Sequence, residues 1–250
     1  MNAKDDRLIV RMAPRVSSRA TTRSASTLHD ALDRYHAGGR REPVNGWFHF
    51  AGALLACAGL ILLIRVANER GSTRHLVGAS VFGATLLLMF SASALYHLRA
   101  ASPRHRLYQR LDHAMIYLFI AGTYTPVCLI TLWPGPIGVV LLATVWSLAA
   151  IGMLLDLIGR PLGRGQATAF YLTMGWAVLP VTPALREHPR LGTWLLIGGI
   201  FYTSGAIAYW RQWPRRRLGP IGFHELWHLC VLAASASHFW AVYAYVLGRS

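Results

Sequence analysis

The sequence is short of charge, above all of negative charge. Only 14% of its 250 residues are Asp, Glu, Lys or Arg, against about 25% in a typical soluble domain, and ten acidic residues face 25 basic ones. Apolar residues make up 54% of the chain and its mean hydropathy is +0.37. A soluble protein needs more charge to cover its surface. The composition therefore predicts a membrane protein and excludes disordered and collagenous chains.

Cysteine is scarce as well. Cys57, Cys128 and Cys230 each lie inside an apolar run, with no paired spacing. This pattern excludes a disulfide scaffold and favours small buried side chains over a cysteine metal cluster. The formal charge of +15 comes from short basic clusters between apolar runs. Because these clusters do not form the basic and aromatic stripe of a nucleic-acid surface, we expect no nucleic-acid partner.

Residues 1–43 differ from the rest of the chain. They are rich in Arg, Ser and Thr, and they lack the apolar core of a secretory signal. Acidic residues such as Asp5 and Asp30 are unlike an organelle transit peptide. We predict a mostly disordered cytoplasmic tail over 1–43 and a membrane domain over 44–246.

Seven apolar stretches follow the tail, each long enough to cross a bilayer, which takes about 20 residues. They run over 44–64, 76–98, 111–132, 137–158, 168–185, 191–210 and 222–246. Backbone groups in lipid must be satisfied within the segment, so all seven are predicted to be helices. The fifth is the weakest, because it is short and Pro180 and Pro183 interrupt it. The predicted fold is an all-α integral membrane bundle of seven transmembrane helices.

The basic residues predict the orientation of this bundle. If the N-terminus is cytoplasmic, nineteen Lys and Arg residues lie on the cytoplasmic side and six on the outer side. An excess of basic residues marks the cytoplasmic side of a membrane protein. We therefore predict a cytoplasmic N-terminus and an outer C-terminus in the plasma (inner) membrane of a bacterium, although the run from Arg65 to Arg74 weakens the contrast.

Strongly polar side chains are few within these stretches, and they share one depth. Such side chains are costly in a membrane and are usually functional. With a cytoplasmic N-terminus, successive stretches cross the membrane in alternating directions. These polar residues then all fall near the cytoplasmic boundary: Asn45, His49, His97, Asp112, His224 and His228. Unrelated polar residues would have no reason to share a depth, so the pattern predicts a functional site at that end.

The spacing of the histidines indicates metal binding. Residues four apart lie on one face of a helix, roughly 6 Å from each other, as His224 and His228 do. With His97 they would form a three-histidine site that leaves a fourth position open, as in catalytic zinc sites. Asp112 would then hold a water on the metal or orient a ligand. Ser93 lies one turn before His97.

Simpler interpretations of the same residues stay open. His97 is also explained by hydrogen bonding at a membrane interface, and Asp112 by pairing with a nearby arginine such as Arg110. Asp156, near the inner end of the fourth stretch, either faces the site or caps the loop that follows it.

The segment His224-Glu225-Leu226-Trp227-His228 also matches HExxH, the pattern of zinc proteases in which the glutamate is the general base. Those enzymes usually take a third ligand downstream, but no Asp or Glu follows His228, and Ala234 stands at the metzincin position. His238 lies roughly 15 Å beyond His228 along the helix axis, too deep for the same metal. The protease interpretation is disfavoured, and His238 is predicted to be a packing residue or a second polar site.

Four ordered motifs run through residues 44–246. They are Asn45-x3-His49; Ser93-Ala-Leu-Tyr-His97; Leu111-Asp112-His113 with Ala121-Gly-Thr-Tyr-Thr-Pro126; and Phe223-His224-Glu225-Leu226-Trp227-His228 with Ser237-His238-Phe239. In this order they resemble the bacterial haemolysin III family, which belongs with the progestin and adipoQ receptors and, more distantly, with the alkaline ceramidases.

The resemblance implies a seven-helix bundle with a cytoplasmic N-terminus and a zinc held by His97, His224 and His228. It places Ser93 and Asp112 beside the metal water. In the adiponectin-receptor branch a glutamine stands at the position of Glu225, which argues against this glutamate as an indispensable base. The remaining polar residues are assigned to the surroundings of the metal or to separate polar sites: Asn45, His49, Glu225 and His238.

Three functions account for these features. The leading hypothesis is a zinc-dependent hydrolase of a lipid amide or ester, with Asp112 and Ser93 as catalytic residues and membrane lipids as partners. The second is a pore-forming or cytolytic protein. The third is a receptor or lipid sensor stabilised by a structural zinc, which needs the same ligands as the enzyme. No obligate protein partner is evident.

Overall fold

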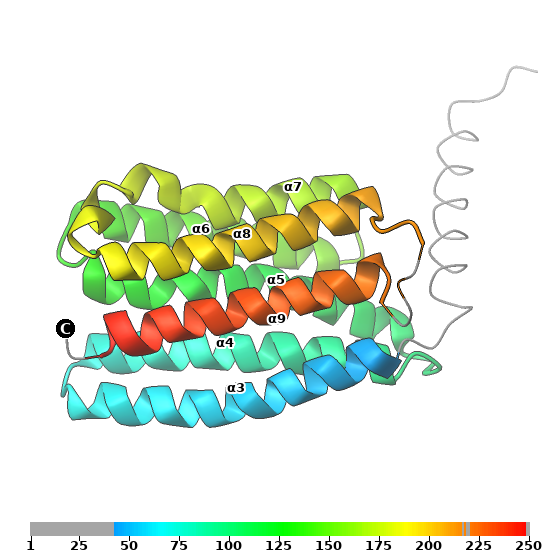
Figure 1. Cartoon of the computed structure of the whole chain (residues 1–250), viewed down its shortest axis with the longest axis horizontal. Helices are drawn as coiled ribbons and strands as arrows, with labels where there is room; N and C mark the ends of the chain where they lie inside the picture. The colour runs from blue at the N-terminus through cyan, green and yellow to red at the C-terminus, as the bar shows by residue number, and fades with distance from the viewer. Residues whose placement is uncertain (1–42, 217, 219–220, 249–250) are drawn as a thin grey trace, which may run out of the picture. The chain divides into compact units, whose positions relative to one another are not determined.

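The computed structural model describes residues 43–216, 218 and 221–248, so the predicted tail lies outside the described residues except for its last position. Across these residues the chain is all-α, with one isolated bridge between Leu218 and Ile221 and no strand. The α-helices are α3 Pro43–Glu69, α4 Thr73–Leu98, α5 His105–Pro126, α6 Pro136–Leu157, α7 Arg164–Gly175, α8 Pro189–Arg211 and α9 Phe223–Ala241 (Figure 1).

Six helical segments are long and apolar enough to cross a membrane, which confirms a multi-pass architecture. They are Val44–Glu69, Thr73–Leu98, His105–Thr131, Pro136–Leu157, Pro189–Arg211 and Phe223–Val246. Two of them continue past their α-helix as a short π-helix, η1 (Val127–Thr131) after α5 and η4 (Val242–Val246) after α9. Each overlaps one of the stretches predicted from hydropathy.

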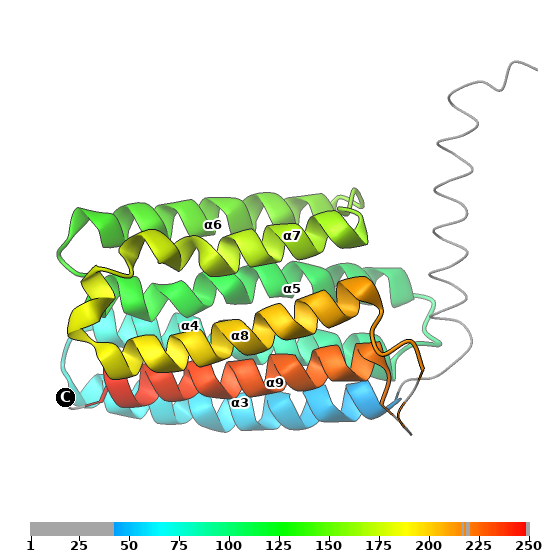
Figure 2. The same ribbon diagram turned by 45° about the horizontal axis from the view of Figure 1, so that its top comes forward.

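The fifth predicted stretch, 168–185, does not form one α-helix. The α-helical part, α7, begins at Arg164 and ends at Gly175, and the chain continues as the 3₁₀ helices η2 (Trp176–Val181) and η3 (Ala184–Glu187) (Figure 2). Pro180 and Pro183 have no N–H to donate and crowd the preceding turn, so the α-helical winding stops before them. Six helices in the described chain, rather than the predicted seven, therefore meet the length and hydropathy of a span.

The outer surface of the spans is covered by large apolar side chains. Leu55 on α3 and Val140 on α6 are 74% and 64% exposed. Apolar surface of this extent is rare on soluble monomers and marks contact with lipid or another protein.

Two apolar clusters fill the interior. One joins α5, α6 and α7, with Tyr124 of α5 donating its hydroxyl to the carbonyl oxygens of Met174 and Gly175 at 2.8 and 2.6 Å. The other joins α3, α4 and α9 around Phe82 and Leu63. Their packing fixes the helices that carry the polar residues.

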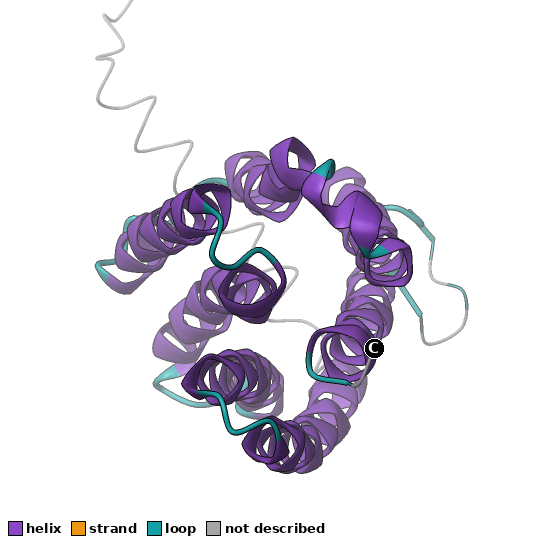
Figure 3. Ribbon diagram, turned by 90° about the vertical axis from the view of Figure 1, so that its left-hand side faces the viewer, coloured by secondary structure: helices purple, strands orange, loops and turns teal. Residues whose placement is uncertain are grey.

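The order of packing brings the first and last helices together. Consecutive helices α3, α4, α5 and α6 pack against one another, and α9 packs against both α8 and α3. Figure 3 looks along the bundle and shows the helix axes side by side. Because α4 ends where α3, α5 and α9 begin (Figure 1), the polar residues predicted to share one depth lie at the same end of the bundle.

Candidate metal centre

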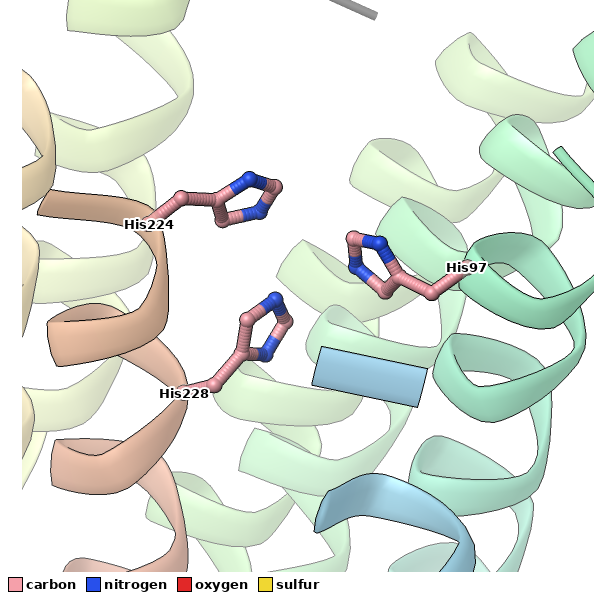
Figure 4. A group of neighbouring side chains, drawn as sticks. All are labelled: His97, His224 and His228. Carbon is pink, nitrogen blue, oxygen red and sulfur yellow. The ribbon is translucent and has the colours of Figure 1, made fainter. Parts of the chain in front are cut away.

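Three imidazoles from two helices meet at this end of the bundle. His97 comes from the last turn of α4, and His224 and His228 come from the first two turns of α9. One ring nitrogen of each lies within 4.8 Å of those of the other two. Figure 4 shows the rings pointing into the space between the two helices.

Ring contacts connect the three imidazoles directly. The ring centroids of His97 and His228 are 4.8 Å apart, those of His224 and His228 are 4.7 Å apart, and those of His97 and His224 are 5.1 Å apart. The His97 and His228 Nε2 atoms are buried and have no hydrogen-bond partner among the described residues. Buried polar atoms normally have a partner, so two such atoms facing one another indicate a site for a ligand.

The donor set fits a small cation. Three neutral imidazoles that leave a position open are the ligand pattern of catalytic zinc sites. In a tetrahedral site with Zn–N distances of about 2 Å, the nitrogens stand about 3.4 Å apart. The ring nitrogens here lie within 4.8 Å of one another.

Asp112 and Ser93 lie next to the three histidines. Asp112, in the second turn of α5, is buried and interacts electrostatically with His224. The Ser93 side chain on α4 is its neighbour, although the hydroxyl does not reach hydrogen-bonding geometry. Arg110 packs its guanidinium against Gly159 after α6.

His49 and Asn45 approach from α3, the first helix of the bundle. His49 Nε2 lies 2.8 Å from His228 Nδ1, and both side chains are buried. Asn45 is fully buried one turn before His49. The structure thus places His49 behind one of the three histidines, a contact that the shared depth alone could not predict.

Glu225 has a local structural contact that the HExxH match does not suggest. Its Oε2 accepts a hydrogen bond from the Gly222 N–H at 2.8 Å, which caps the first turn of α9. The side chain is buried at the helix terminus. Glu225 thus has the contact expected of a glutamate that caps a helix.

His238 lies apart from the three-histidine group. Its Nε2 is 3.2 Å from the Leu195 carbonyl oxygen of α8, and its ring packs on Tyr202 and directly over Gly198. These contacts make it part of the α8–α9 packing.

Asp156 belongs to a second buried polar group. It is buried, and its Oδ2 has no hydrogen-bond partner among the described residues. It interacts electrostatically with His113, Tyr117 and Tyr171. The side chain therefore faces the interior of the bundle. The tyrosines were missed at the sequence level, because tyrosine is common throughout these apolar stretches.

Comparison with known proteins identifies the relatives of the chain. Residues 38–239 match the family described as haemolysin-III related. The chain belongs to this family. "Hemolysin-3" of Bacillus cereus is 37% identical over 211 residues, which cover 83% of this chain and 93% of that protein. The "Hemolysin-3 homolog" of Bacillus subtilis is 35% identical over 209 residues, 82% and 94% of the two chains. The human "Monocyte to macrophage differentiation factor" is 27% identical over 230 residues, 85% and 90% of the two chains.

Family and structure together give the location. The bacterial relatives and the six apolar spans make this haemolysin-III-related chain a multi-pass protein of the bacterial plasma membrane, as predicted.

Proposed function

We propose that this protein is a zinc-dependent hydrolase of a lipid amide or ester. The observation that supports the proposal most strongly is the group of His97, His224 and His228, whose ring nitrogens lie within 4.8 Å of one another. Asp112, the acid–base group that hydrolysis needs, is buried beside them. The three imidazoles would hold the zinc.

The chemistry divides between the metal and the protein. When bound, zinc supplies Lewis acidity and lowers the pKa of water towards about 7. Asp112 accepts a proton from the attacking water as the water oxygen adds to the carbonyl carbon of the substrate. As the bond to the amine or alcohol breaks, Asp112 returns that proton to the leaving group. The Ser93 hydroxyl donates a hydrogen bond to the oxyanion that forms in between.

The position of the site favours membrane lipids as substrates. The residues lie near one end of apolar spans, at the level where the polar junction of a lipid meets its acyl chains. Large apolar side chains cover the outside of the same helices, so an acyl chain can approach sideways between them.

We propose that the metal centre lies on the cytoplasmic side, with the N-terminus inside, the C-terminus outside, and α7 with η2 as a seventh span. The excess of basic residues in the loops at the metal end supports this orientation. Alkaline phosphatase fused after residue 250 tests it. Active phosphatase supports an outer C-terminus, and inactive but expressed fusion protein contradicts it.

The first test of function is the metal content of detergent-purified protein, followed by fatty-acid release from lipid amides and esters. About one zinc per chain, with turnover that Asp112→Asn lowers by about 10²- to 10⁴-fold, supports the hydrolase. Absence of zinc from folded wild-type protein overturns it. Zinc without turnover rejects the hydrolase and leaves a structural metal, as in a lipid sensor.

Cytolysis is a second candidate, because one relative carries the name "Hemolysin-3". The two apolar clusters that fill the described interior argue against a conduction path. Dye leakage from liposomes that contain the purified protein tests it. Leakage that is independent of zinc and unchanged in His97→Ala would support cytolysis.

A further inference from the structure

We propose that His49 is a positioning residue that fixes the tautomer of His228, so that the His228 Nε2 lone pair faces His97 and His224. This inference rests on the proposed metal centre. The observation behind it is the 2.8 Å contact between His49 Nε2 and His228 Nδ1. The two rings stand nearly perpendicular, at 86°, with centroids 4.2 Å apart.

The proton between the two rings can be placed by exclusion. Two ring nitrogens at hydrogen-bond distance share one proton, so one donates and the other accepts. If His49 donates, then neutral His228 carries its own proton on Nε2 and cannot bind a metal through that atom. If His228 donates from Nδ1, its Nε2 has a free lone pair. Only the second arrangement lets His228 act as a ligand, and it requires the His49 Nε2 to be an acceptor.

The surroundings hold His49 in place for this role. The side chain is only 2% exposed, and the Phe90 ring of α4 packs edge-on against it at 5.1 Å between centroids. His49 comes from α3, which supplies none of the three candidate ligands. A ligand histidine normally donates its second N–H to such an outer partner, which sets the orientation of the ring.

An imidazole partner differs in charge from the carboxylate that often stands in this position. Neutral His49 accepts a hydrogen bond without adding a negative charge to a buried site, where an ionised group would be costly. The three-histidine centre therefore keeps the full positive charge of a bound metal, which is the condition for strong polarisation of a carbonyl group.

Replacement of the acceptor tests the proposal. His49→Leu removes the acceptor, whereas His49→Gln keeps a side-chain oxygen that can accept the Nδ1 proton of His228. His238→Leu, which removes a half-buried imidazole elsewhere in the same bundle, is the matched control. Zinc affinity is measured on full-length protein in detergent by chelator competition, and the visible spectrum of the cobalt(II)-loaded protein reports the ligand geometry.

We expect His49→Leu to weaken zinc binding by about 10- to 100-fold, as is typical for loss of an outer partner, and to shift the cobalt spectrum. His49→Gln should restore most of the affinity, and His238→Leu should leave affinity and spectrum unchanged. If His49→Leu keeps the zinc affinity and the cobalt spectrum of the wild type, the role of His49 is overturned and the proposed metal centre is not. Loss of the metal in both His49 variants would make His49 a ligand and also overturn it.

Two outcomes need separate readouts. If wild-type protein binds neither zinc nor cobalt, the metal centre and the role of His49 are both overturned. If His49→Leu does not fold, ¹⁵N chemical shifts of the histidines in metal-free wild-type protein decide the question. A proton on Nδ1 of His228 supports the proposal, and a proton on its Nε2 overturns it.

Discussion

The two ends of α9 carry the same kind of residue in different surroundings. His228, in the second turn, has one ring nitrogen hydrogen-bonded to His49 and the other without a partner among the described residues. His238, near the end of the helix, is bonded to the Leu195 carbonyl through one nitrogen, and its other nitrogen is likewise unpartnered there. The His228 side chain is buried and that of His238 is half-buried.

Unpartnered atoms alone therefore do not distinguish the two histidines. The difference lies in what surrounds the unpartnered nitrogen. That of His228 belongs to a group in which two more imidazoles are within ligand reach, whereas His238 packs between Tyr202 and Gly198 of α8. A buried histidine becomes a candidate ligand through its neighbours, and the following predictions test that distinction in order of expected effect.

The largest effect is expected for removal of the two ligands on α9. His224→Ala/His228→Ala should reduce the zinc content from about one per chain to none, because a single remaining imidazole does not hold the ion. Mass spectrometry of purified protein measures it. His238→Ala, at the other end of the helix, should keep its zinc. Equal zinc loss in the His224→Ala/His228→Ala variant and the His238→Ala variant would contradict the view that only the first two turns of α9 carry ligands.

A second change separates metal binding from chemistry at the metal end. Asp112→Asn should lower kcat by about 10²- to 10⁴-fold, the usual contribution of an acid–base group, while the zinc content stays at the wild-type level. Turnover of the lipid substrate and metal analysis on the same preparation give both values. Unchanged kcat would remove Asp112 from the mechanism.

At the packing end, Gly198→Ala should destabilise the protein without touching the metal. The new Cβ would collide with the His238 ring and lie 3.2 Å from the Ala234 carbonyl oxygen. Overpacking of this kind costs about 1–3 kcal/mol. Thermal unfolding in detergent measures it, with Gly192→Ala as the control on the same helix, where a Cβ meets nothing within 4 Å. Equal stability of the two variants would show that the α8–α9 contact yields easily.

The smallest effect is expected for Glu225→Gln. The amide oxygen of glutamine can still accept the Gly222 N–H, so the cap, the zinc content and kcat should all stay close to the wild type. Glu225→Ala should lose about 1 kcal/mol of stability through loss of the cap. A loss of about 100-fold in kcat for Glu225→Gln would instead identify a general base and revive the protease interpretation.

Hydropathy predicted the spans well, because lipid imposes one requirement on every segment that crosses it. Residues 136–157 and 189–211 follow the predicted stretches within two residues at either end. The exception is the segment from Arg164 to Val181. The apolar pattern predicted roughly where it lies, but not that its α-helix ends at Gly175 and continues as a 3₁₀ helix. That change depends on how Pro180 disrupts hydrogen bonding locally.

The site was predicted as far as depth and helical spacing allow. These two properties predict that His97, His224 and His228 lie together, and the structure places them side by side. They could not show which nitrogen of His228 faces which neighbour, that Glu225 turns back to Gly222, or that Asp156 meets two tyrosines. Those contacts depend on rotamers and on the rotation of each helix about its axis.

The tighter winding after α7 changes how far a short segment can reach. The twelve residues of α7 rise about 18 Å, and the six residues of η2 rise about 12 Å. These rises along the two helix axes sum to about 30 Å, comparable to the thickness of a hydrocarbon core, whereas the same residues wound as α-helix would rise only about 27 Å. The prolines that interrupt this helix thus lengthen it, so the proposed seventh span would cross a bilayer with fewer residues than its neighbours use.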